Sequence, residues 1–125
     1  MVEGMAAAKQ GRVLVVDDDP DIRELLKNAL DEHGYGIDAA ADAAEARRRL
    51  TREEYDLVVT DLLLGAEGDG LFVARYARGR RCRVLLVTGD HARAELLDAS
   101  GFPYLLKPFR VGTLLAAIDT IVSER

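Results

Sequence analysis

The stretch VLVVDDDPDIRELL, residues 13–26, decides the fold class. Its first four residues form a continuous apolar run, which is typical of a strand covered by helices on both faces of a parallel sheet. Apolar residues then recur at helical spacing from Ile22 onward. Asp19 is expected to cap this helix, with Pro20 in its first turn. The segment therefore predicts a β-strand followed directly by an α-helix.

Apolar runs and helical patterns alternate along the rest of the chain. Further strands are predicted at 57–59, 84–87 and 104–106, with a weaker strand at 36–40 near a sheet edge. Helices are predicted at about 22–30, 42–50, 71–78, 91–99 and 111–122. This alternation predicts an α/β fold, a flavodoxin-like doubly wound (βα)5 sandwich. Right-handed crossovers favour a parallel five-stranded sheet of order 2-1-3-4-5.

Length and composition limit the possible functions. The 125 residues suit one domain, which we place at 12–125 behind a flexible N-terminal tail at 1–11. The formal net charge of −5 argues against direct nucleic-acid binding. The single cysteine, Cys82, excludes an internal disulfide and favours a reducing, cytoplasmic location. No apolar run reaches the length of a membrane span.

Polar residues of particular kinds end the apolar strands. The first strand is followed by Asp17 and Asp18, the third by Asp61, the fourth by Thr88 and the fifth by Lys107. Taken singly, each residue could be an ordinary helix cap or turn residue. Ligands of such sheets bind beyond the carboxyl ends of the strands. Together, three carboxylates, a hydroxyl and an ammonium are therefore expected at one edge of the sheet.

The chemistry of this set points to phosphoryl transfer. Neighbouring carboxylates repel each other, and a divalent cation such as Mg²⁺ removes that repulsion. One carboxylate can act as a nucleophile and form an aspartyl phosphate. Lys107 would neutralise one phosphoryl oxygen and Thr88 would donate a hydrogen bond to another.

Four segments of the chain resemble the response-regulator receiver family of two-component signal transduction. VLVVDDDPDIRELL is similar to the first strand and helix of that family, and YDLVVTDLLL (55–64) to the segment around its phosphoacceptor. VLLVTG (84–89) and YLLKPF (104–109) are similar to its fourth and fifth strand ends. The resemblance runs from about Arg12 to the C-terminus.

The resemblance implies a metal site and a phosphoacceptor. Asp61 corresponds to the phosphoacceptor, and Asp17 and Asp18 to the acidic pair, with Asp18 the more direct metal ligand. The backbone carbonyl of Leu63 would complete the protein ligands. Mg²⁺, or Mn²⁺ in its place, is the implied cofactor.

The resemblance also implies a switch. Thr88 corresponds to the switch hydroxyl, Lys107 to the lysine of the family, and Tyr104 to the aromatic residue that turns inward on phosphorylation. The Lys107–Pro108 bond is expected to be cis. Phosphorylation would then shift a pre-existing two-state equilibrium and reshape a distant face.

Three features of the sequence depart from the usual pattern of the family. Gly65 replaces a proline after Asp61, in a loop that we expect to be long and mobile. The interval from Thr88 to Lys107 is short, so the fourth helix is expected to be trimmed. The small Gly89 should leave an open path to the phosphoryl group for a donor or a water.

We therefore expect a stand-alone, single-domain response regulator, because no effector segment follows the last predicted helix. It would receive phosphate from a histidine kinase or a phosphotransfer protein, then bind a downstream protein partner or relay the phosphate, as a monomer or weak dimer. It is not expected to be an enzyme acting on an external substrate. The alternatives are a phosphorylation-independent interaction module and a receiver excised from a longer regulator.

Other features are interpreted as structural. The arginine-rich stretches at 47–49 and 75–83 are expected to be solvent-facing helix surfaces. His33 and His91 lack partners at zinc-ligand spacing, and Cys82 is expected to be unreactive.

Overall fold

The fold is built on a parallel sheet whose strands lie in the order β2-β1-β3-β4-β5. The computed structural model describes residues 11–64 and 69–124. The strands are β1 (Arg12–Val16), β2 (Gly36–Ala40), β3 (Leu57–Asp61), β4 (Arg83–Thr88) and β5 (Tyr104–Leu106). This confirms the predicted (βα)5 sandwich and the position of 36–40 at a sheet edge. Most of the predicted tail and Gly65 lie outside the described residues.

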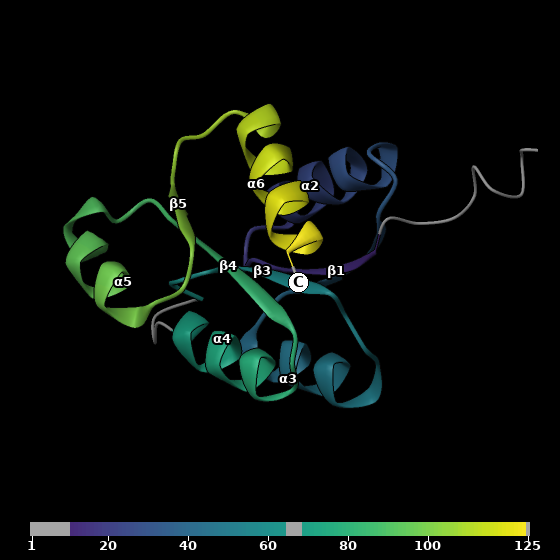
Figure 1. The fold of residues 1–125 in the computed structure, drawn as a ribbon, viewed down its shortest axis with the longest axis horizontal. Helices are drawn as coiled ribbons and strands as arrows, with labels where there is room; N and C mark the ends of the chain where they lie inside the picture. The colour runs from purple at the N-terminus through teal and green to yellow at the C-terminus, as the bar shows by residue number, and fades with distance from the viewer. Residues whose placement is uncertain (1–10, 65–68, 125) are drawn as a thin grey trace, which may run out of the picture.

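Helices cover both faces of the sheet (Figure 1). Helices α2 (Pro20–Glu32) and α6 (Val111–Ser123) lie on one face, and α3 (Ala43–Arg52) and α4 (Gly70–Gly79) lie on the other. The predicted helix at 91–99 is instead a 3-10 turn, η1 (His91–Arg93), followed by the short α5 (Ala94–Ser100). No helix in the described part of the chain is long and apolar enough to cross a membrane.

Alternating side chains of the strands form two separate cores. Val13 and Val15 pack with residues of α2 and α6, whereas Leu14 and Val16 pack with residues of α3 and α4. This follows from the two-residue period of a strand, which sends successive side chains to opposite faces. Because both faces are buried, the strands read as continuous apolar runs, as predicted.

Side-chain caps begin α2 and α3, and the cap of α2 is the predicted Asp19. The carboxylate of Asp19 accepts the Asp21 N–H at 2.9 Å, and the carboxylate of Asp42 accepts the Glu45 N–H at 2.8 Å. The Glu45 carboxylate in turn accepts the N–H of Ala41 at 2.9 Å, one residue before the cap. These bonds satisfy backbone donors that have no partner within the helix.

The end of α4 has an unusual residue. Arg81 has a φ of 65°, in the left-handed region where glycine is normally found. Its N–H donates to the Arg78 carbonyl at 3.0 Å, and the Cys82 N–H donates to the Ala77 carbonyl at 2.9 Å. This is the Schellman pattern of helix termination, built here without glycine.

Candidate functional site

The carboxyl ends of four parallel strands bring the predicted polar residues to one edge of the sheet. Asp61 ends β3, Thr88 ends β4, and Asp17 and Lys107 directly follow β1 and β5. Backbone hydrogen bonds continue beyond the strands: the Asp17 N–H donates to Ala40 at 3.2 Å, and the Lys107 N–H donates to Thr88 at 2.7 Å. Asp17 and Thr88 are buried, at 2% and 1% exposure. The hydrogen-bonded backbone therefore fixes the Cα positions of these residues.

Lys107 bridges two of the carboxylates. Its Nζ lies 3.0 Å from Oδ2 of Asp61 and 3.3 Å from Oδ2 of Asp17. Burial lowers the pKa of Lys107, but its hydrogen bond to Asp61 and the charges of both carboxylates outweigh burial and raise that pKa overall. Lys107 is therefore charged at neutral pH.

Burial has a different effect on Asp17. It raises the pKa of the Asp17 carboxyl, and the nearby Asp61 charge adds to this, whereas the Asp19 N–H and the Lys107 charge oppose it. The net shift is upward, so the ionised form of Asp17 is disfavoured relative to a solvated carboxylate. A further cation beside it would relieve this penalty.

The second oxygens of both carboxylates accept backbone N–H groups. Oδ1 of Asp17 accepts from Asp19 at 2.9 Å, and Oδ1 of Asp61 accepts from Leu63 at 3.1 Å. The sequence analysis missed Arg23, whose Nη1 donates to the Asp17 carbonyl oxygen at 2.7 Å. Arg23 lies in the first turns of the helix that follows Asp17, and this position in the sequence could have indicated a contact with the acidic segment. Arg23 therefore fixes the backbone of the acidic segment.

Asp18 is exposed. Within residues 11–64 and 69–124, no set of three or more His, Cys, Asp or Glu side chains is placed to hold a metal ion. Asp17 and Asp61 both contact Lys107, and the gathering of all three carboxylates stays a prediction. The roles of Asp18 and of the Leu63 carbonyl as metal ligands stay predictions.

The two predicted switch residues lie in different environments. The buried Thr88 accepts the Asp90 N–H on its Oγ at 3.1 Å, which leaves the hydroxyl proton free for another acceptor. Tyr104 is partly buried and its hydroxyl donates to Asp98 of α5 at 2.6 Å. The Tyr104 hydroxyl is therefore held at the α5 surface.

The rim of the site contains a cis peptide bond and an exposed histidine. The Lys107–Pro108 bond is cis, as predicted. Nε2 of the exposed His91 lies 2.9 Å from the Lys107 carbonyl oxygen, which places this residue at the rim. At Gly89, the nearest atom to an added Cβ is the Lys107 Cβ at 3.8 Å, so this position leaves room for access.

Gly70 sets the approach of α4 to the end of β3, and the sequence analysis gave it no role. Its N–H donates to the Leu62 carbonyl at 3.0 Å. A Cβ at this position would lie 2.1 Å from the Asp61 carbonyl oxygen and 2.6 Å from the Leu62 Cα. Only glycine therefore lets the helix begin this close to the end of β3.

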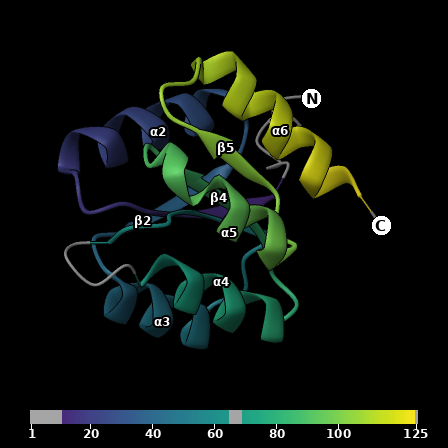
Figure 2. The same ribbon diagram turned by 90° about the vertical axis from the view of Figure 1, so that its left-hand side faces the viewer.

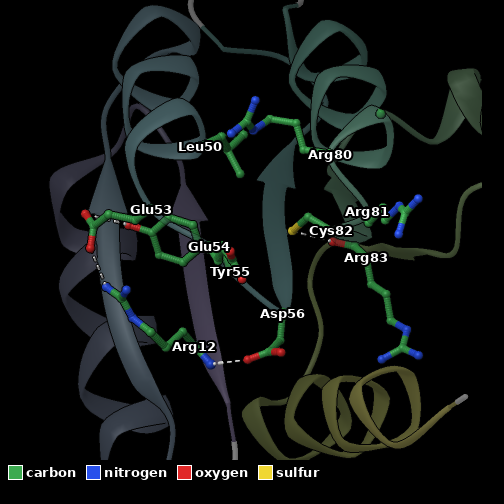
Figure 3. Close-up of a pocket in the computed structure, with 11 residues that line it drawn as sticks. Arg12, Leu50, Glu53, Glu54, Tyr55, Asp56, Arg80, Arg81, Cys82 and Arg83 are labelled. Carbon is green, nitrogen blue, oxygen red and sulfur yellow. Dashed lines mark hydrogen bonds and ion pairs between the residues drawn. The ribbon is translucent and has the colours of Figure 1, made fainter.

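A separate pocket of about 790 Å³ lies at the amino-terminal ends of the strands, opposite the carboxyl ends that carry Asp17, Asp61 and Lys107 (Figure 3). Arg12 donates to Asp56 at 2.7 Å through its backbone N–H and to Glu53 at 2.9 Å through its side chain, so the charges of Arg12 and Glu53 are paired. Cys82 also lines the pocket, at 4% exposure. Burial, with a smaller contribution from the Asp56 charge, raises the pKa of its thiol to about 12.

Comparison with known protein families gives one consistent match. The family model described as the response regulator receiver domain matches residues 13–119. Protein PetR of Rhodobacter capsulatus is 38% identical over 122 residues, which cover 94% of this chain and 51% of PetR. Response regulator MprA of Mycobacterium leprae is 36% identical over 116 residues, which cover 89% of this chain and 50% of MprA. The chain thus spans about half the length of these curated relatives.

Solved structures agree with this match. The response regulator TrrA of Thermotoga maritima, crystallised in complex with Mg²⁺-BeF, has a TM-score of 0.77 and 36% identity. The chemotaxis response regulator CheY4 of Vibrio cholerae has a TM-score of 0.77 and 26% identity. Each alignment covers 88% of this chain and 97% of the other.

Proposed function

The chain belongs to the response regulator receiver domain family of two-component signalling, and from this we propose that it accepts a phosphoryl group on Asp61. Receiver domains are signalling domains rather than classical enzymes. The observation that carries the proposal is the contact of Lys107 with both Asp61 and Asp17 at the carboxyl edge of the sheet.

The proposed reaction transfers phosphate from a histidine kinase or phosphotransfer protein. A carboxylate oxygen of Asp61 attacks the phosphorus of a phosphohistidine, so that a P–O bond forms while the P–N bond breaks and the histidine regains a proton. The charged Lys107 neutralises one phosphoryl oxygen, and the Thr88 hydroxyl donates a hydrogen bond to another. Gly89 leaves the donor a path to Asp61.

Mg²⁺ is the cofactor that we propose for this site. Mg²⁺ is usually held by one or two carboxylates and by phosphate oxygens. Asp17 and Asp61 fit this requirement because they already share one cation and because burial disfavours the charge of Asp17. Asp18 and the Leu63 carbonyl are the proposed additional ligands. When bound, the ion would supply charge neutralisation between the carboxylates and the incoming phosphoryl group.

The proposed output is a change at the face formed by β5 and α5. When Thr88 turns toward the phosphoryl group, space opens for the Tyr104 ring to turn inward and leave Asp98. A downstream protein partner would read this change, or the phosphate would be relayed onward. A cytoplasmic location and a monomer or weak dimer are part of this proposal, whether the domain acts alone or as part of a longer regulator.

Phosphorylation by acetyl phosphate in Mg²⁺ tests the proposal. Asp61→Asn should abolish acid-labile phosphate while the circular dichroism spectrum stays unchanged, because the substitution removes the nucleophile but keeps its shape. Lys107→Ala should retain Mg²⁺ binding and lose most of the phosphorylation rate. Phosphate uptake by Asp61→Asn at the level of the unsubstituted protein would show that the site is assigned to the wrong residue.

A further inference from the structure

The arginine run on α3 divides its side chains between two surfaces. Arg49 lies 3.8 Å from a carboxylate oxygen of Glu45 and 3.9 Å from one of Asp38, so its charge is compensated. Arg47 and Arg48 are exposed, and no ion pair joins either of them to a carboxylate of the described residues. The expectation of one uniform solvent-facing run therefore does not describe Arg49, whereas Arg47 and Arg48 are exposed cations without an ion pair among the residues that the structure describes.

These two cations line a groove between two helices. Helices α3 and α4 lie side by side on the same face of the sheet (Figure 2). Between them is a groove of about 710 Å³ that is lined by small, basic and aromatic side chains, including Ala43, Arg47, Arg48, Arg52, Asp69 and Phe72. Phe72 is 49% exposed, so much of this large apolar side chain is accessible to a binding partner.

The aromatic part of this groove is held in place by neighbouring side chains. Phe72 stacks on Tyr76 with ring centroids 6.4 Å apart and an interplanar angle of 19°. The Tyr76 hydroxyl lies 2.6 Å from Oγ of Thr51, and the Arg47 guanidinium lies 5.5 Å from the Tyr76 ring centre. Phe72 is thus supported from one side and open on the other, which lowers the entropy cost of using it as a binding anchor.

We propose that the α3–α4 groove docks an acidic protein segment that carries an apolar side chain. The apolar side chain would cover the exposed face of Phe72, and carboxylates on either side of it would pair with Arg47, Arg48 and Arg52. Arg52 also has no ion pair with a described carboxylate. Asp69 is the single acidic residue among the residues that line the groove. Charge complementarity therefore selects an acidic partner.

A nucleic acid is the less suitable occupant of the groove. The formal net charge of the chain is −5, so long-range electrostatics would oppose the approach of a polyanion. A short acidic segment samples mainly the local field of the three arginines, and its apolar side chain adds a contact with Phe72 that a phosphate backbone lacks. The proposal does not depend on the reaction at Asp61.

Titration of ¹⁵N-labelled protein with a synthetic peptide tests the proposal. The peptide has a central Leu-Phe pair flanked by Glu and Asp residues, and its controls are the same peptide with Gln and Asn, a single-stranded RNA and a DNA duplex. We expect the acidic peptide to shift amide signals of α3 and the first turns of α4. Its Kd should rise about tenfold or more for the neutral peptide and on adding salt.

Matched variants locate the binding. Phe72→Ala, and separately the double substitution Arg47→Glu with Arg48→Glu, should each raise the Kd about tenfold or more. Leu96→Ala, at another exposed apolar residue, and Arg75→Glu, on α4 but outside the groove, should leave the Kd unchanged. All these positions are exposed, and circular dichroism checks that each variant is folded.

Several results would overturn the docking site. One is the absence of binding at about millimolar peptide, and another is an equal Kd for the groove variants and the control variants. The others are amide signal shifts on another face of the domain and tighter binding of the RNA or DNA than of the peptide in the groove. Asp61→Asn should bind the peptide normally. Loss of peptide binding and loss of phosphorylation are therefore separate outcomes.

Discussion

Gly70→Ala should displace the end of β3, which carries the proposed phosphoacceptor Asp61. The added Cβ would lie 2.1 Å from the Asp61 carbonyl oxygen, and real Cβ contacts are essentially never shorter than 3.0 Å. The helix and the strand end must therefore separate by at least 0.9 Å, the difference between these two distances. Such a movement stretches the 3.0 Å hydrogen bond from Gly70 to Leu62 beyond a useful length.

The expected cost follows from these contacts. A buried hydrogen bond lost without replacement costs about 1–3 kcal/mol, and overpacking adds about 1–3 kcal/mol. Alanine returns about 1 kcal/mol through helix propensity. The free energy of unfolding should therefore fall by roughly 3 kcal/mol, with a range of about 1–5, which leaves a typical domain folded.

Urea denaturation and acetyl phosphate labelling measure both consequences. For a domain with a slope near 2 kcal/mol per molar, the urea midpoint should fall by about 1–2 M. Because displacements of about 1 Å can cost about a hundredfold in rate, phosphorylation should slow by a similar factor. Gly79→Ala is the matched control on the same helix, since no atom lies within 4 Å of its added Cβ. If Gly70→Ala matched the unsubstituted protein in both measurements, the close approach would be refuted.

Three further substitutions test other parts of the structure. Arg81→Gly should raise the free energy of unfolding by about 1 kcal/mol, because glycine adopts the left-handed conformation without strain; an unchanged urea midpoint would contradict this. Asp17→Asn should raise the urea midpoint in Mg²⁺-free buffer at neutral pH, because burial raises the pKa of Asp17 and its ionisation therefore costs stability; a lower midpoint would contradict this. Hydrogen bonds from His33 and Tyr35 lower the pKa of Asp119, so the stability from this contact is present above the ordinary pKa of 3.8 and is lost as pH falls through the lowered value. With Asp119→Asn, the urea midpoint should change less with pH in the acid range. An unchanged pH dependence would argue against the contribution of Asp119 to stability.

The sequence predicted most of the fold because burial on both faces leaves a direct pattern. The runs at 13–16 and 84–87 are apolar without interruption, and both lie inside the sheet. The less apolar 36–40 lies at an edge, where coverage is less complete. The cap at Asp19 was also predicted correctly, since it depends on neighbours within a few residues.

Contacts between distant segments could not be predicted in the same way. Lys107 meets Asp61 across 46 positions, and only the strand order brings their side chains together. The close approach at Gly70 depends on how α4 packs against β3, which no local pattern encodes. For the arginine run on α3, successive helical positions point in different directions, but the contact of Arg49 with Asp38 depends on how α3 packs against β2.

The burial of Cys82 has a practical consequence for spectroscopy. Because it is the single cysteine in the chain and its thiol has a pKa of about 12, it should react slowly with maleimides at neutral pH. A cysteine introduced on the surface could then carry a fluorophore or spin label without mutation of the native thiol. Distances between α5 and the rest of the domain could be followed in this way while phosphate is added and removed.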